Sequence, residues 1–231
     1  MTAIQNLIGV LSSPSKTYES LRAKPSWLLA AVVLIVVALV GQMIALPKID
    51  FEEISRAQIE ASNRQLTEAQ IEQSVEIGAK FGSIMAMVSV IAGFPIGWAL
   101  IALLMWVLVR MMGGLDLSYV QSLSTTVHSM APWIVHSILT IPLLLTRSEI
   151  TPEDIQTGGV LKHGLGAFIE SEGATQQALN SINVFSIWTV VLLGIGFSVV
   201  GKISKGKAFA AAIALWVVGI LFKVLGASLG G

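Results

Sequence analysis

Two histidines in an apolar segment are the first residues whose type could do chemistry. His128 and His136 are eight residues apart, which is close to two helical turns. A protein metal site needs about three or four ligands, and no carboxylate or cysteine accompanies the pair in this segment. Pro132 lies between them and can kink the helix. We therefore expect histidines that hydrogen-bond between helices, and no metal or other cofactor.

The last apolar segment holds two further candidates. Lys223 is the lone charge inside any apolar segment, and its long stem can carry the ammonium to the membrane interface. A substrate or counter-ion role is the alternative for this lysine. GASLG at residues 226–230 matches the G-x-S-x-G nucleophile pattern. That mechanism needs a strand, a strained turn and a following helix, whereas one residue follows Gly230, so the match is coincidental.

Composition identifies the elements that must position these residues. Hydrophobic residues make up 54% of the 231-residue chain and charged residues 12%, about half of what a soluble domain carries. A membrane span needs about 20 apolar residues. Five segments meet this requirement, and each is expected to be a transmembrane helix: residues 27–46, 85–109, 122–146, 183–201 and 208–229.

Charge is segregated between the two sides that five spans create. One side carries seven basic and two acidic residues, a net charge of +5. The other side carries six basic and twelve acidic residues, a net charge of −6, in the loops 47–80 and 147–182. Because basic loops stay in the cytoplasm, we expect a cytoplasmic N-terminus, an outside C-terminus and both longer loops outside. Lys202, Lys205 and Lys207 are interpreted as a topology anchor, with an anionic lipid site as the alternative.

The first 26 residues predict two short amphipathic helices. Ile4, Leu7, Ile8 and Leu11 share one helical face. A second helix begins where Pro14 follows a serine, and a proline ends it shortly before the first span. These helices either lie on the inner membrane surface, where they could dock a partner, or pack under the bundle. The residues assigned to surface or partner docking are Pro14, Tyr18, Leu21, Pro25 and Trp27.

At this point the residues resemble a known family. LSSPSKTYESLRAKPSWLL ahead of the first span is similar to the lead segment of bacterial Yip-domain proteins, which are relatives of the Ypt/Rab-interacting membrane proteins. NVFSIWTVVLLGIGFSVVGKISKGKA resembles the fourth helix of that family with its basic turn, and APWIVHSIL resembles the third. The resemblance covers nearly the whole chain and implies five spans with a cytoplasmic N-terminus.

Glycine and proline punctuate the apolar segments. GFPIG at residues 93–97 places two glycines four apart, which permits close helix contact, around a proline that removes a helix hydrogen bond. A pore or binding site at a broken helix is the alternative to packing. The residues assigned to helix packing or kinks are Gly93, Pro95, Gly97, Pro132, Gly194 and Gly196.

Both long loops predict helices of their own. Thr67 with Gln70 forms a capping box. Thr151 followed by proline and two acids is another helix start. In the second loop an apolar stripe precedes Gly173, made by Leu165, Phe168 and Ile169. We expect amphipathic helices that cap the bundle from outside, with acidic faces that could bind a partner.

The predicted fold is all-α: one membrane domain over residues 1–231, a polytopic bundle of five transmembrane helices with short amphipathic N-terminal helices and helical outer loops. The spans contain no Asp or Glu, which weighs against a proton-driven transporter. No phosphate loop, dinucleotide fingerprint or basic aromatic patch is present, so we expect neither catalysis nor nucleotide or nucleic-acid binding.

The predicted function is that of a scaffold or membrane-organising factor in the bacterial inner membrane. Its expected partners are membrane lipid and other membrane proteins, or further copies of itself. A small-solute or lipid transporter or channel is the alternative.

Overall fold

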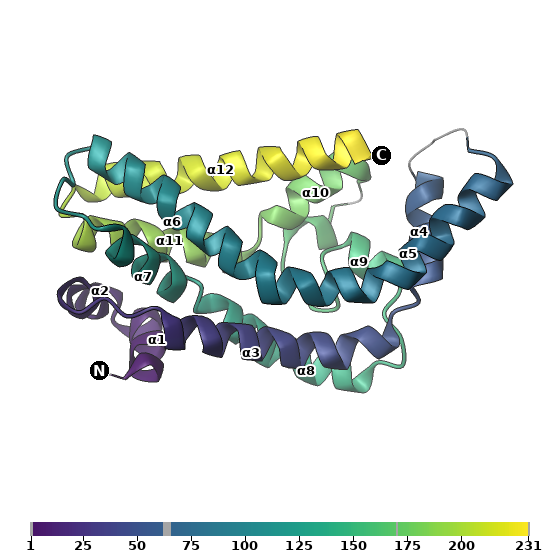
Figure 1. Cartoon of the computed structure of the whole chain (residues 1–231), viewed down its shortest axis with the longest axis horizontal. Coiled ribbons are helices and arrows are strands. Elements are labelled where there is room, and N and C mark those ends of the chain that lie inside the picture. Colours follow the sequence, from purple (N-terminus) through teal and green to yellow (C-terminus); the bar gives the residue numbers. More distant parts are fainter. Residues whose placement is uncertain (1, 62–65, 170, 231) are drawn as a thin grey trace. The chain divides into compact units, whose positions relative to one another are not determined.

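The computed structural model describes residues 2–61, 66–169 and 171–230, and helices dominate them (Figure 1). The only β-type pairing among these residues is two isolated bridges, between Ile49 and Ile150 and between Gly164 and Asn183. Four helices are long and apolar enough to cross a membrane: Leu28–Lys48, Glu68–Met111, Tyr119–Thr146 and Lys205–Ser228. A fifth apolar helix, Val184–Val200, has 17 residues. The all-α membrane bundle predicted from the sequence is therefore confirmed.

The chain divides into two compact units. Unit 1 contains Met1–Ala38, Ala92–His136 and Phe185–Val218. Unit 2 contains Leu39–Ile91, Ser137–Val184 and Gly219–Gly231. Several apolar helices contribute to both units because the division falls inside them.

Unit 1 begins with the two short helices of the lead, α1 (Ala3–Ser12) and α2 (Pro14–Ala23). Thr2 caps α1 in a capping box with Gln5, and Pro14 occupies the first position of α2. The helix α3 (Leu28–Ala45) starts after Pro25 and a short extended stretch. The outward side chains of α3 are apolar at helical spacing, as expected where a helix faces lipid: Leu29, Val32, Val36, Val40 and Met43.

The second predicted span forms the last part of a longer helical run. Its first helix, α5 (Glu68–Val88), starts at the predicted capping box of Thr67 and Gln70. A π-helical segment, η2 (Ser89–Gly93), links it to α6 (Phe94–Met111). Pro95 lies in the first turn of α6, so the break in regular hydrogen bonding falls beside the proline.

The third predicted span consists of two helices, α7 (Tyr119–Ser129) and α8 (Pro132–Thr146). Ser118 caps α7 in a capping box with Gln121. The turn at Met130 and Ala131 separates the two helices, and Pro132 is the first residue of the second. The predicted kink at Pro132 is thus a helix end followed by a new start, which suits a residue without a backbone N–H.

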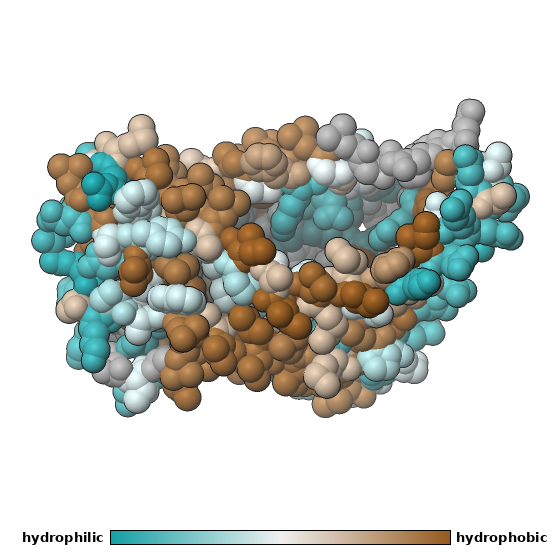
Figure 2. All heavy atoms as spheres, viewed as in Figure 1, coloured by the Kyte–Doolittle hydropathy of each residue, from teal (hydrophilic) through white to brown (hydrophobic). Residues whose placement is uncertain are grey.

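The remaining apolar helices are α11 (Val184–Val200) and α12 (Lys205–Gly230). The helix α11 is central to unit 1, since nine of its residues are buried and they include Phe185, Leu192 and Phe197. On the face shown in Figure 2, hydrophobic residues lie over α3 and α6, and hydrophilic residues gather over α4 and the first turns of α5.

Unit 2 holds the structured loops. A 3₁₀ turn, η1 (Leu46–Lys48), leads into α4 (Phe51–Ala61), which packs along α5. The second loop contains α9 (Pro152–Gln156), the 3₁₀ turn η3 (Leu165–Ala167) and α10 (Gly173–Ser181). The helix expected from the stripe before Gly173 is absent from these described loop residues: the stripe forms η3 instead, and the helix starts at Gly173.

Candidate functional site

The most polar buried region of unit 1 is the short helix α7. Its fully enclosed polar side chains are Ser122, Ser124, Thr125, Thr126, His128 and Ser129. Several of them bond back to the carbonyl one turn earlier, as Thr125 does to Gln121 at 2.8 Å and Ser129 does to Thr125 at 2.8 Å. Such hydroxyls still have capacity to bond neighbouring helices. We call this set the α7 polar cluster.

Tyr18 joins α2 to the α7 polar cluster. Its phenol lies 2.7 Å from the hydroxyl of Ser129, and its side chain is fully buried. Burial raises the pKa of the Tyr18 phenol, and the hydrogen bond to Ser129 lowers it by less, so the net shift is upward. The phenol is therefore neutral at physiological pH and acts as a hydrogen-bonding group.

Gly196 of α11 makes room for this contact. A Cβ on Gly196 would stand 2.6 Å from the Cγ2 of Thr125 and 2.9 Å from the Cζ of Tyr18. Only glycine lets the tyrosine ring and the threonine lie against the helix backbone at this depth. Two residues earlier in α11, Gly194 faces the ring of Phe209 from α12, where an added Cβ would lie 2.8 Å from ring carbons.

Further hydrogen bonds join α7 to the residues ahead of α3 and to α6. The Ser124 hydroxyl donates to the Ser26 carbonyl at 2.9 Å, and the Gln121 amide donates to the Arg22 carbonyl at 2.9 Å. Toward α6, the Ser122 hydroxyl donates to the Ala102 carbonyl at 2.6 Å. These contacts fix the linker between α2 and α3 on one side of α7 and the α6 backbone on another.

Three buried polar atoms have no hydrogen-bond partner among the described residues: Asn6 Oδ1, Thr126 Oγ1 and His128 Nε2. The other ring nitrogen of His128 lies 2.9 Å from the Ser124 carbonyl. A carbonyl only accepts, so Nδ1 carries the hydrogen, and Nε2 of the neutral ring presents a lone pair. Each of these three buried atoms of unit 1 could therefore still form a hydrogen bond.

Two of the residues assigned to a docking face, Tyr18 and Leu21, lie inside unit 1. Tyr18 and Leu21 are buried in the core of unit 1, so neither side chain is available to a membrane surface or a partner. Both residues have the burial expected from the alternative prediction, in which the lead packs under the bundle. Pro14 begins α2, Pro25 follows its end, and Trp27 is partly exposed just ahead of α3.

Gly97, one of the two glycines assigned to helix packing in the second span, has open space beside it among the described residues. No heavy atom other than its helix neighbours lies within 4 Å of a Cβ built on Gly97. Gly93 is the last residue of the π-helical segment η2 and is exposed. The structure thus places the Gly93–Gly97 face outward, with Pro95 at the start of α6.

The two histidines of the third span lie in different helices. His128 belongs to α7, whereas His136 in α8 packs on aromatic rings, with centroids 5.4 Å from Trp133 and 5.0 Å from Phe185. Among the described residues no group of three or more His, Cys, Asp or Glu side chains could hold a metal ion. Lys223 is exposed on α12.

The three lysines occupy the turn between α11 and α12 and the start of α12. Lys202 has a positive φ of 53°, a conformation that lysine rarely adopts, and its ammonium lies 3.9 Å from Asp116. The Lys207 ammonium donates to the Met112 carbonyl at 2.8 Å. Lys205 is exposed at the first position of α12. The turn thus lies against the turn that follows α6.

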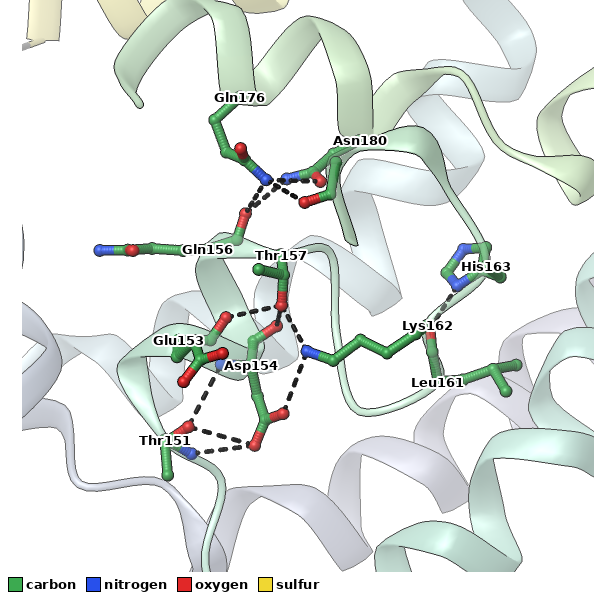
Figure 3. A network of polar contacts seen from close by, with 11 residues as sticks. Thr151, Glu153, Asp154, Gln156, Thr157, Leu161, Lys162, His163, Gln176 and Asn180 are labelled. Atoms are coloured by element: carbon green, nitrogen blue, oxygen red, sulfur yellow. Dashed lines mark hydrogen bonds and ion pairs between the residues drawn. The ribbon is translucent and has the colours of Figure 1, made fainter. Parts of the chain in front are cut away.

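A second polar network organises the loop between α8 and α11 (Figure 3). Lys162 forms an ion pair with Asp154 at 3.3 Å and also donates to Thr157. Burial raises the pKa of the Asp154 carboxyl. The hydrogen bonds from Lys162 and Thr151, with the charges of Lys162 and Arg147, more than offset this effect, so the pKa lies below its ordinary value.

The same network holds α10 in place. Gln176 donates to the Gly166 carbonyl at 2.7 Å and to the Gln156 carbonyl at 3.2 Å. Asn180 donates to the same Gln156 carbonyl at 2.6 Å. Two side chains of α10 therefore secure the end of α9 and the turn η3, which gives the loop a defined structure.

Sequence reasoning missed the α7 polar cluster. The signal was present, because SLSTTVHS at residues 122–129 concentrates Ser and Thr in a segment predicted to cross the membrane. Such residues hydrogen-bond across helices when they lie in lipid. The loop network gave a weaker signal, since Gln176 and Asn180 are ordinary surface residue types.

The apolar outward faces and the inward polar contacts define a polytopic α-helical membrane protein. Within that class, residues 8–226 match the model of the Yip1 domain, so the chain belongs to the Yip1 domain family. It is also 28% identical over 224 residues to "Membrane protein YknW" of Bacillus subtilis strain 168, covering 95% of this chain and 88% of that protein. No solved structure matches the chain. The family resemblance found in the sequence is confirmed.

Proposed function

We propose that this Yip1-family protein is a non-enzymatic scaffold or membrane-organising factor that acts through partner proteins and lipid. The observation that supports the proposal is that polar groups inside unit 1 form hydrogen bonds between its helices. Hydroxyl and amide groups of α7 are engaged by α2, by the residues ahead of α3 and by α6. Polar groups committed to helix contacts build a fixed platform, whereas a carrier needs groups that exchange partners with a substrate.

The residues whose types or motifs could suggest catalysis make ordinary structural contacts, and this supports a non-catalytic role. Ser228, the serine of the G-x-S-x-G match, lies within α12, and its hydroxyl donates to the Val224 carbonyl at 2.9 Å. A serine nucleophile needs a strained turn that exposes its hydroxyl. His136 belongs to an aromatic cluster with Trp133 and Phe185.

We place the protein in the bacterial inner membrane with a cytoplasmic N-terminus and an outside C-terminus. The charge difference between the two sides supports this orientation. The loops of unit 2 would then face outside. Along their surface, a cavity of about 480 Å³ between α4 and α5 is lined by charged residues: Glu52, Arg56, Glu72, Glu76 and Lys80. Partners are expected to be other membrane proteins or further copies of the chain.

Crosslinking in native membranes tests the scaffold proposal. A photoreactive residue would replace exposed Glu76 on α5, and in a matched control it would replace Val217 on α12, which faces lipid. A defined protein captured from position 76 but not from position 217 is expected. Capture that is the same from both positions would contradict a specific loop partner.

A transporter or channel is the second candidate, and the unpartnered Asn6 Oδ1, Thr126 Oγ1 and His128 Nε2 favour it. Buried polar atoms without protein partners are suited to hold a small polar solute. Solute flux into vesicles that contain the purified protein, lost on His128→Leu and retained in a Lys223→Gln control, would favour the transporter over the scaffold.

A further inference from the structure

Three apolar side chains stand out from the loop network of unit 2. Leu165 is 42% exposed, Phe168 75% and Ile169 47%. They lie on and directly after the 3₁₀ turn η3, and we call them the η3 ridge. Folding normally buries large apolar side chains, and an exposed group of them marks an interaction surface.

The backbone beneath the η3 ridge is held to the start of α11. Leu165 donates its N–H to the Ile182 carbonyl at 3.1 Å, and Val184 donates to the His163 carbonyl at 3.4 Å. The bridge between Gly164 and Asn183 lies between these two bonds. The ridge therefore stands within a few residues of the first turn of the apolar helix.

Gly166 fixes which way the ridge faces. This glycine is buried, its carbonyl accepts from Gln176, and a Cβ on it would collide with Asn180 Oδ1. Gly166 is pressed against α10, whereas the neighbouring Leu165 and Phe168 are exposed. The polar network that orders the loop therefore occupies the space beside Gly166 and leaves the ridge side chains exposed.

The length of α11 indicates what covers the ridge. Its 17 residues span about 25 Å, about 5 Å less than the hydrocarbon core. We take the lysine turn after Val200 as one interface, in line with its interpretation as a topology anchor, and the shortfall then falls at the end where α11 begins. An exposed apolar stripe starts there with Val184 and continues with Ile187 and Val191. The η3 ridge is adjacent to the start of this lipid-facing stripe.

We propose that the η3 ridge inserts into the lipid leaflet at the beginning of α11 and completes the apolar length of this short span. The occupant is lipid: Phe168 and Ile169 contact the acyl chains next to the headgroups. The ridge lies within a few residues of Val184, the exposed first residue of α11, and would supply the missing apolar height. The inference depends neither on the partner protein nor on which side of the membrane the loops face.

Spin labels measure this insertion directly, because the chain has no native cysteine. Single variants Phe168→Cys and Ile169→Cys would be labelled and placed in vesicles of phosphatidylethanolamine and phosphatidylglycerol. Collision with oxygen, which concentrates among acyl chains, is compared with collision with a water-soluble nickel chelate. Val217→Cys on α12 is the lipid control, and Gln177→Cys on the polar helix α10 is the water control.

The oxygen-to-nickel collision ratio at positions 168 and 169 is expected to be several-fold higher than at 177 and similar to that at 217. A ratio equal to that at 177 would overturn the proposal. Low collision with both reagents would also overturn it, since protein would then cover the ridge. Should the labelled variants fail to fold, hydroxyl-radical footprinting of the unmodified chain in the same vesicles decides: Phe168 must be protected relative to the denatured chain.

Discussion

Tyr18 in α2 and Ser129 in α7, which are 111 residues apart in the sequence, share a buried hydrogen bond of 2.7 Å. This bond makes the N-terminal lead an internal part of unit 1. Leu21, one turn further along α2, belongs to the same core. The sequence leaves two placements open for this segment, on the membrane surface or under the bundle, and Tyr18 and Leu21 pack in the core of unit 1.

The lead should consequently contribute to stability. Tyr18→Phe removes one buried hydrogen bond and is expected to cost about 0.5 to 1.5 kcal/mol. Leu21→Ala creates a cavity and should cost about 2 to 5 kcal/mol. Thermal melting of the purified protein in detergent measures both effects. Ile8→Ala, at an exposed position of α1, is the matched control and should melt like the native chain. Native melting of the Leu21 variant would mean that α2 does not pack as described.

Two glycines that the sequence treats alike should respond differently. Gly196→Ala places a methyl group against Tyr18 and Thr125, and overpacking of this kind costs about 1 to 3 kcal/mol. Gly97→Ala meets no other heavy atom within 4 Å and should change stability by less than about 0.5 kcal/mol. Comparing the two melting temperatures in one detergent is the test. A larger loss from Gly97→Ala would show that its outward face is covered in the native assembly.

Asp154 should make the loop network sensitive to acid. Its pKa is lower in the folded loop than in the unfolded chain, so its contribution to stability is complete above the unfolded pKa of about 3.9. That contribution is lost as the pH falls through the folded pKa. Hydrogen exchange of residues 151–162, corrected for intrinsic rates, should therefore accelerate on acidification below about pH 4.

Asp154→Asn should remove this acid response and loosen the same residues at neutral pH. Glu153→Gln, at the exposed neighbouring position, should retain the native response. An acid response that persists in the Asp154 variant would assign it to another group.

Membrane topology can be read from single cysteines. A cysteine replacing Gln177 or Ser74, both exposed in unit 2, should react with an impermeant thiol reagent added to intact cells. A cysteine replacing Ser15 in α2 should react only after the membrane is opened. The reverse pattern would invert the proposed orientation.

Element type and approximate position could be predicted wherever local composition decides them. Each apolar segment became a helix, because a backbone in lipid must satisfy its hydrogen bonds internally. Helix starts such as Thr67 with Gln70 depend on neighbours three residues apart and were equally visible.

The direction in which α2 faces could not be predicted from its own residues. An apolar face of a short helix is stabilised equally by lipid and by a membrane bundle, so Tyr18 and Leu21 give the same pattern in either case. The buried position of α2 depends on its contacts with Ser129 and Gly196, which are both far from it in the sequence.

The conformation of the η3 ridge also could not be predicted from its own residues. Leu165, Phe168 and Ile169 have helical spacing, yet the segment forms only a single turn, which is held by Gln176 and by a backbone bond to Ile182. Long-range contacts here override local periodicity.

The distance along the chain between Tyr18 and Ser129 also sets an order of assembly. The lead is synthesised before α7, so Tyr18 lacks its Ser129 partner until 111 further residues have been made. At bacterial or eukaryotic elongation rates this takes roughly 6 to 22 s. Throughout that interval the Tyr18 phenol cannot form the hydrogen bond that it makes in the folded unit 1. The lead can therefore take its place in unit 1 only after α7 has been made.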